Sequence, residues 1–181
     1  MKPFLFVILI LLGLPMGLGG CAGMETPTPP TLHGVYELGD FTYAAYETGE
    51  VKRPNDVLHQ VGGDAYLNYD IAPYVKEIHH TVFQKSGLQK KISPYVIYAS
   101  VDRLFINDSG FTYGFTYTVT YRIIEKASGA EKLHRTYTQH VDVGVYFNVN
   151  FGVSLDRLYT LCATEFMNDA EVQKIVGWTP A

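Results

Sequence analysis

Histidine is the side chain with the widest potential for chemistry in this chain, which contains six of them. A neutral imidazole binds metal ions, and its ordinary pKa lets it move protons near neutrality. His79 and His80 are neighbours in a segment with helical spacing, and adjacent helix positions do not share a face. His134 and His140 share one face of a predicted strand but stand about 20 Å apart along it. Since no HExxH or Cys/His zinc spacing occurs, we predict no metal site, no cofactor, and histidines that are solvated at the surface.

The residues of nucleophilic catalysis do not form a known pattern. The Gly-x-Ser-x-Gly motif is absent from the sequence. Cys162 falls on the apolar stripe of a predicted helix, which indicates a small buried hydrophobic side chain. Asp102, Asp108 and Asp142 could supply a carboxylate pair, but their spacing alone does not bring two of them together. We therefore expect no catalytic residues and a protein that is not an enzyme. A small hydrolase, with a pocket joining His, Asp and Ser, is the alternative.

The N-terminal segment has the composition of a secretory signal. Lys2 gives a positive start, an apolar run from Phe4 to Leu14 follows, and small residues lead to Leu18-Gly19-Gly20-Cys21. Charged, apolar and small-residue regions in this order are typical of exported proteins. The apolar stretch of about 15 residues is shorter than the roughly 20 that a membrane-spanning helix needs. An ordinary cleaved signal with an incidental cysteine is a further alternative.

This segment resembles the bacterial lipoprotein signal family, whose pattern is a Leu, two small residues and an obligatory Cys. The resemblance implies that the thiol of Cys21 is joined to diacylglycerol, that residues 1–20 are removed as a signal peptide, and that the new amino end is acylated. Two or three acyl chains would anchor a protein durably, whereas a single chain holds only marginally. Ala22 stands where an Asp would retain such proteins in the inner membrane of enteric-type bacteria. The resemblance therefore implies a protein that is lipid-anchored at the periplasmic face of the outer membrane.

Length and composition indicate one tethered domain. Residues 21–31 contain the cysteine and a linker with three prolines among small polar residues, which favours a semi-extended spacer. Residues 32–181 then suit a single periplasmic domain. The formal net charge of −4 gives no basic excess, so we expect no nucleic acid partner. With Cys21 lipidated, Cys162 is the only other thiol, and no intrachain disulfide can form.

Hydrophobic periodicity predicts an α+β fold, with an antiparallel sheet of about four strands and two helices packed on one face. Strand-forming segments lie at 32–52, 94–106, 111–124 and 133–145. In 111–124 the odd positions are aromatic or aliphatic, and the even positions are mostly Thr. Strict alternation of this kind indicates one buried face and one face in water. The hairpin partner 133–145 repeats the pattern more weakly, because Arg135 and Gln139 interrupt its apolar side.

Capping residues mark the expected helices. Asp70 is a good N-cap for a helix with one apolar stripe, and Gly87 ends this helix. Ser154 is expected to cap a second long helix, and Asp169 to begin a final short one. The two longer helices are those expected to cover the sheet.

Tyrosine and phenylalanine are unusually numerous, with 14 and 10 copies. The apolar, odd-numbered positions of the alternating strand include three tyrosines, which are expected to face the core: Tyr113, Tyr117 and Tyr121. An aromatic contact surface for a partner or a glycan is the alternative, because tyrosine is enriched at interfaces. The possible contact surface outside the core lies in the loop predicted after the last strand: Tyr146, Phe147 and Phe151.

The layout of lipidated cysteine, proline linker, tyrosine-rich hairpin and closing helix is loosely similar to small bacterial envelope lipoproteins. That group includes accessory lipoproteins of lipid-transport ABC systems and the partner lipoprotein of lipopolysaccharide assembly. The resemblance implies a non-catalytic accessory or assembly subunit of a cell-envelope complex, with an envelope protein as its partner and the membrane reached through the lipid anchor. A module that binds a lipid or a cell-wall glycan is the alternative.

We expect Cys21→Ser to abolish incorporation of labelled palmitate and to release the protein from the membrane fraction, because the acylated thiol is lost. Fractionation of cells that carry the wild-type or the variant chain measures both effects. Cys162→Ser is the matched control and should remain labelled. A Cys21→Ser chain that stays processed and membrane-bound would contradict the lipoprotein interpretation.

Overall fold

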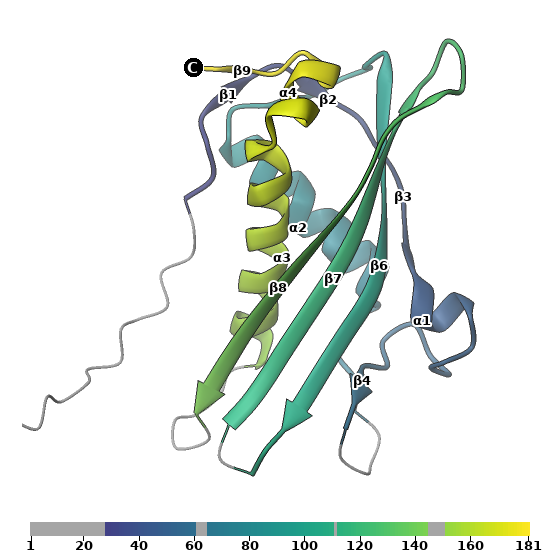
Figure 1. Ribbon diagram of the computed structural model, residues 1–181, viewed down its shortest axis with the longest axis vertical. Coiled ribbons are helices and arrows are strands. Elements are labelled where there is room, and N and C mark those ends of the chain that lie inside the picture. The colour runs from purple at the N-terminus through teal and green to yellow at the C-terminus, as the bar shows by residue number, and fades with distance from the viewer. Residues whose placement is uncertain (1–27, 61–64, 111, 145–150) are drawn as a thin grey trace, which may run out of the picture.

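A twisted β-sheet with two long helices packed on one of its faces forms the body of the protein (Figure 1). The structure is a computed structural model, and it describes residues 28–60, 65–110, 112–144 and 151–181. In chain order the elements are β1 (Leu32–His33), β2 (Val35–Tyr36), β3 (Leu38–Tyr43), α1 (Ala44–Glu47), β4 (Leu58–His59), α2 (Ile71–Lys85), β5 (Gln89–Lys90), β6 (Tyr95–Asp108), β7 (Thr112–Glu125), β8 (Glu131–Gly144), α3 (Phe151–Asn168), α4 (Ala170–Val176) and β9 (Thr179–Pro180). The predicted α+β class is confirmed.

Within the described residues the main sheet has five strands of mixed direction, in the order β3-β6-β7-β8 with β4 also paired to β6. The strands β6, β7 and β8 form an antiparallel meander, which includes the predicted hairpin of 111–124 with 133–145. Both β3 and β4 run parallel to β6, so the prediction of an antiparallel sheet of about four strands is wrong. The chain crosses through α2 between β3 and β6, and a crossover of this length joins parallel strands. The described part of the chain has four helices. The two long helices α2 and α3 cover the sheet, α4 is the short helix expected after Asp169, and α1 was not predicted.

The odd-numbered side chains of β7 point toward the helices. Phe115, Tyr117, Val119, Tyr121 and Ile123 are fully buried, as their alternation predicts. Burying a large apolar side chain contributes roughly 1.5–3 kcal/mol, so this single strand face supplies a large share of the core. Tyr117 and Tyr121 are therefore core residues and not part of a contact surface.

The helix α2 begins after Asp70 and ends before Gly87, as the capping residues predict. Gly87 has a φ of +91°, a left-handed conformation that glycine adopts at little steric cost. The helix α3 begins at Phe151, so the N-cap predicted at Ser154 is wrong. Phe151 continues the apolar stripe of Leu155 one turn further back, which extends the helix and leaves Ser154 buried within it.

The stripe of α3 that faces the sheet carries Cys162 and Phe166. Cys162 is fully buried, which confirms the prediction of a small buried hydrophobic side chain. Burial raises the pKa of its thiol far above the usual range, so a reactive thiolate does not form near neutral pH. Phe166 stacks on Tyr121 of β7 with 4.3 Å between the ring centroids, and this contact joins the helix to the sheet.

His79 of α2 is a polar group buried in this core, so the prediction of a solvated surface histidine is wrong for this residue. Its Nδ1 lies 2.7 Å from the backbone oxygen of Val75, and its Nε2 is hydrogen-bonded to the hydroxyl of Tyr121. A neutral imidazole satisfies both partners, since one nitrogen donates to the carbonyl and the other accepts from the phenol. Burial lowers the pKa of His79 to about 4. The neighbouring His80 is half-buried and hydrogen-bonded to the hydroxyl of Tyr36.

We expect the free energy of unfolding to fall by up to about 3 kcal/mol as the pH decreases from about 6.5 to about 4 because of His79 alone. In this window the unfolded chain protonates the imidazole and the folded chain does not, so acid favours unfolding. His79→Gln keeps a donor and an acceptor but does not titrate, and it should remove this part of the pH dependence. Urea unfolding at several pH values measures the difference.

His134→Gln, at an exposed position, is the control for that experiment and should retain the wild-type pH dependence. The His79→Gln chain should be less stable than wild type above about pH 6.5, because the amide fits the imidazole site imperfectly, and this difference should shrink as the pH falls. Parallel pH profiles for wild type and His79→Gln would contradict the lowered pKa of His79.

Candidate functional site

The outer face of the sheet carries hydroxyl and imidazole side chains. Neither α2 nor α3 covers this face (Figure 1). The even-numbered residues of β7 and β8 point to this side, as the alternation predicts, and most of them are exposed or half-exposed. Five threonines form the centre of the face: Thr116, Thr118 and Thr120 of β7, and Thr136 and Thr138 of β8. We refer to these five residues as the threonine array.

Cross-strand pairing places the threonines in rows. Thr118 lies opposite Thr138 and Thr120 opposite Thr136, and the paired hydroxyl oxygens are 3.0 Å and 2.6 Å apart. The Thr120 hydroxyl also donates to the carboxylate of Asp102 on β6, at 2.5 Å. Because a hydroxyl has a single proton, Thr120 must accept from Thr136. This row of hydrogen bonds therefore runs in one direction, from β8 toward β6.

At one end of the array Thr116, His140 and Asp142 are hydrogen-bonded in series. The Thr116 hydroxyl lies 2.9 Å from Nδ1 of His140, and Nε2 of His140 lies 3.0 Å from a carboxylate oxygen of Asp142. This is the order of groups in a hydrolytic triad. The side chains of His140 and Asp142 are, however, 52% and 65% exposed. A triad draws its power from a site that excludes water, so this geometry gives no reason to assign the three residues a catalytic role.

Two arginines lie over aromatic rings on the β6 side of the array. Cζ of Arg103 is 4.6 Å from the ring centroid of Phe105, and Cζ of Arg122 is 6.0 Å from that of Tyr98. A guanidinium that lies on a ring keeps its charge and its hydrogen-bond donors. Arginine and aromatic side chains are also the types enriched at protein interfaces. The two pairs therefore give the outer face residues suited to anchoring a partner.

A polar cleft opens where the outer face meets β4. It has a volume of about 390 Å³ and is lined by Glu50, Leu58, His59, Asp102, Arg103 and Phe105. An adjoining cleft of about 230 Å³ shares Glu50, Leu58 and His59 with it. Asp102 lines the larger cleft and also accepts the hydrogen bond from Thr120. One carboxylate thus connects the cleft to the threonine array.

The three aspartates that the sequence singles out have separate partners. Asp102 binds Thr120, Asp142 binds His140, and Asp108 accepts the backbone N–H of Gly110 at 2.7 Å. Across the part of the chain that the structure describes, no group of three His, Cys, Asp or Glu side chains could hold a metal ion.

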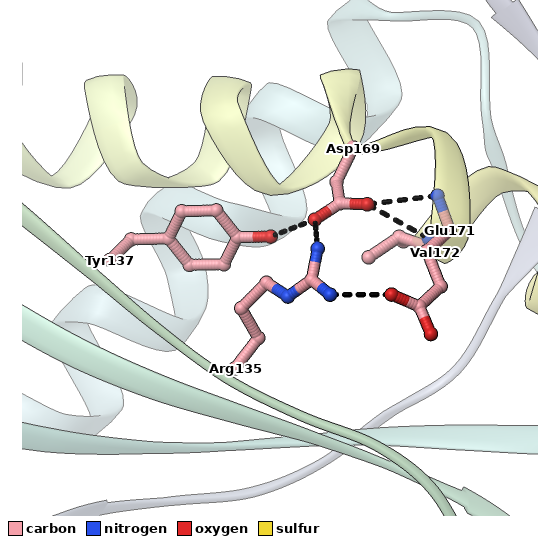
Figure 2. A network of polar contacts seen from close by, with 5 residues as sticks. All are labelled: Arg135, Tyr137, Asp169, Glu171 and Val172. Carbon is pink, nitrogen blue, oxygen red and sulfur yellow. Dashed lines mark hydrogen bonds and ion pairs between the residues drawn. The ribbon is translucent and has the colours of Figure 1, made fainter.

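The strand β8 is joined to the helices through the two polar residues that interrupt its inner face. Gln139 donates to the carboxylate of Glu165 on α3 at 2.7 Å. Arg135 forms ion pairs with Asp169 and Glu171 at the junction of α3 and α4 (Figure 2). The weaker alternation of β8 in the sequence is therefore explained by its place at the margin of the sheet, where helix carboxylates meet it.

Asp169 is the centre of this network (Figure 2). One carboxylate oxygen accepts the backbone N–H groups of Glu171 and Val172 at 2.8 Å and 3.4 Å, which confirms the predicted start of the last helix. The other oxygen accepts from the Tyr137 hydroxyl at 2.9 Å and from Arg135. Partial burial acts to raise the pKa of Asp169, but the hydrogen bonds, led by that of Tyr137, hold the pKa below its usual range.

Cys21, Tyr146 and Phe147 lie outside the described residues, so lipid attachment and most of the predicted aromatic contact surface stay predictions. Phe151 is described, and it is the first residue of α3 rather than a loop residue. It is 39% exposed and lies edge-on to Tyr113 of β7, with 5.0 Å between ring centroids. Phe151 therefore contacts the inner side of the sheet, and it does not join the threonine array.

Sequence reasoning misses the polar cleft and the position of Arg103. The cleft exists because the two-residue strand β4 pairs with β6 and brings His59 beside residues 102–105. A strand of two residues leaves no periodic signal. The alternation of β6 is also interrupted by a bulge between Val101 and Arg103. Before the bulge the odd-numbered side chains face the helices, and after it the even-numbered ones do.

No family model matches the sequence, and no curated protein matches it either. Among solved structures, the fold is similar to that of a protein from Xanthomonas campestris whose family model is DUF330. The TM-score is 0.56 and the identity 15%, over 83% of this chain and 88% of that chain. A minor lipoprotein from Acinetobacter baumannii is similar at a TM-score of 0.41 and 13% identity, over 77% of this chain and 95% of that chain.

The first of these comparisons shows that the α+β fold occurs in another bacterial protein, and the second is too distant to support an argument. Among the described residues, no helix combines the length and the apolar character needed to cross a membrane.

We expect Asp169→Ala to lower the free energy of unfolding by about 2 kcal/mol, because α4 loses its N-cap and Tyr137 and Arg135 lose their acceptor. Urea denaturation measures the change. Glu171→Ala removes only an exposed partner of Arg135 and should cost less than about 1 kcal/mol. Equal losses in the two variants would mean that Asp169 does not organise the network.

Proposed function

We propose that this protein is a bacterial lipoprotein, attached through Cys21 to the periplasmic face of the outer membrane, and that it serves as a non-catalytic accessory or assembly subunit of a cell-envelope complex. The outer sheet face is the surface that meets the partner. The observation that carries this proposal is the asymmetry of the sheet. The helices α2 and α3 cover one face, and the other presents the threonine array and two arginine–aromatic pairs.

The threonine array is suited to binding because its side chains are already ordered. Threonine is β-branched and has few rotamers, and the hydroxyls of the two cross-strand rows hold one another in place. A surface that is ordered before binding loses less conformational entropy when a partner arrives. Each hydroxyl also has acceptor capacity beyond its present hydrogen bond, so the array can still bind donors of a partner.

The path of the N-terminal chain leaves this face accessible. Pro29 lies in a groove with Ile78 and Val82 of α2 and with Asp156 and Thr160 of α3. The described chain thus begins along the helices, on the side of the molecule away from the threonine array (Figure 1). A linker that joins a lipid at Cys21 to this point does not need to cross the outer face.

A module that binds a cell-wall glycan is the second candidate, and the polar cleft favours it. The cleft combines two carboxylates, an imidazole and a guanidinium with one aromatic ring. Convergent polar groups of this kind suit a ligand with many hydroxyls better than they suit an acyl chain.

Crosslinking in intact cells, followed by purification of the lipidated chain and mass spectrometry, tests the accessory role. We expect one envelope protein in stoichiometric amount with the wild-type chain. Arg103→Glu should reduce its recovery about tenfold, because an anchoring guanidinium becomes a repelling carboxylate. Lys174→Glu makes the same charge change at an exposed position of α4 and is the matched control.

Undiminished recovery with Arg103→Glu would place the contact elsewhere than on the outer face. If the wild-type chain recovers no protein partner and is retained on purified peptidoglycan, the glycan-binding candidate replaces the accessory role.

A further inference from the structure

The strand β8 ends the sheet and has a long edge with no partner strand among the described residues. It contains 14 residues, and β7 is its one strand neighbour in the described part of the chain. No other described backbone group is hydrogen-bonded to the backbone of β8. In an antiparallel ladder about half of the residues direct their N–H and C=O groups away from the neighbouring strand. β8 therefore offers a row of unpaired donors and acceptors that can template a further strand.

The devices that usually protect a sheet edge are weak in β8. Short length, proline, bulges and inward-pointing charges discourage edge pairing. β8 is long and contains no proline. Its bulge against β7 lies at Lys132, close to the start of the strand, and its register is regular from Leu133 to Gly144. Its inward charge, Arg135, is neutralised by Asp169 and Glu171. The opposite edge differs, because β3 and β4 are short and are separated by α1.

We propose that β8 pairs in antiparallel fashion with β8 of a second copy of this chain, about a two-fold axis at Tyr137. In this register Thr136 lies opposite Thr138 of the partner subunit, and Lys132 lies opposite Asp142 of the partner subunit. A two-fold contact repeats each pair once on either side of the axis. The result is one continuous sheet whose two outer faces are contiguous. This inference goes beyond the accessory role and does not depend on it.

Charge complementarity selects this register. A shift of one residue would place outer side chains of one copy opposite inner side chains of the other. The alternative registers therefore differ from the proposed one by two residues. A shift in one direction places Lys132 opposite His140 of the partner subunit. A shift in the other direction places Lys132 opposite Gly144 of the partner subunit and His134 opposite Asp142 of the partner subunit. Lys132 is the bulged residue of β8 against β7, and both Lys132 and Asp142 are exposed. Of the three registers, the one centred on Tyr137 alone sets the charges of Lys132 and Asp142 against each other, twice, and such cross-strand pairs are stabilising.

The same register makes the threonine array continuous across the contact. Thr120 and Thr136 form a row within one copy, and Thr138 of the partner subunit extends that row. Directly opposite residues of an antiparallel pair have Cβ atoms about 4.5–5.5 Å apart. Threonine hydroxyls in this arrangement can bond, as those of Thr118 and Thr138 do within one chain at 3.0 Å. The seam therefore repeats an interaction that the sheet already contains.

Disulfide trapping of the full chain in cell membranes tests the pairing. Thr136→Cys/Thr138→Cys should convert most of the protein to a dimer on non-reducing gels, because each new thiol faces the other across the axis. Two positions that are next-but-one on a strand point the same way but are too far apart to bridge within one chain. Thr118→Cys/Thr120→Cys is the matched control on the same face of β7, one strand inward, and should stay monomeric.

The single variants report the register. Thr136→Cys or Thr138→Cys alone would be trapped efficiently only after a shift of two residues, and that result would overturn the register centred on Tyr137. The wild-type chain, with Cys21 and Cys162, gives the background. A monomer with Thr136→Cys/Thr138→Cys would overturn pairing through β8 altogether.

Charge exchange is the second measurement, made by sedimentation of the full chain in detergent. Lys132→Glu and Asp142→Lys should each raise the dimer dissociation constant about tenfold, because two attractive pairs become repulsive. Lys132 also forms an ion pair with Glu125 at 3.0 Å. A loss of dimer affinity in Lys132→Glu therefore has two sources, the intersubunit pair and this pair within the chain. The double variant Lys132→Glu/Asp142→Lys restores the intersubunit attraction and should recover dimer formation. A double variant as weak as the singles would overturn the proposed contact.

Discussion

Tyr121 of β7 is fully buried and places its hydroxyl group in the middle of the layer between β7 and the helices. A buried hydroxyl without a partner costs free energy, and here the imidazole of His79 provides that partner. The same imidazole satisfies a carbonyl of its own helix at Val75. Because His79 must face the sheet, the rotation of α2 about its axis is determined. The stacking of Phe166 on Tyr121 then positions α3 against the same residue.

This packing makes the two faces of the sheet chemically unequal. The inner face is covered by aromatic and aliphatic side chains that belong to one buried cluster with those of α2 and α3. The outer face carries exposed and half-exposed side chains that hydrogen-bond among themselves. At the margin of the sheet, Arg135 and Gln139 occupy inner positions of β8 and meet carboxylates of the helices. The margin is thus satisfied on its inner side, and among the described residues its outer backbone edge has no partner strand.

The parts of the fold that were predictable depend on residues close together in the chain. Alternation along β7 identified its buried and solvent faces, and Asp70, Gly87 and Asp169 marked helix ends correctly. The errors have a common cause. His79 follows Val75 by one helical turn and so lies on the buried stripe, but its polar type suggested solvent. Whether an imidazole is buried depends on a partner such as Tyr121, which belongs to another element.

Sequence by itself determined the α+β class, the three long strands, the two long helices and the threonine-rich character of one sheet face. Each of these follows from periodicity or capping within one segment, where the deciding interactions are local. Only the tertiary structure decided that β3 and β4 run parallel to β6, that His79 is buried, and that residues 50–59 form a cleft with residues 102–105. Those features are decided by contacts between segments far apart in the chain, and the free energy of such a contact is not encoded in the pattern of either segment alone.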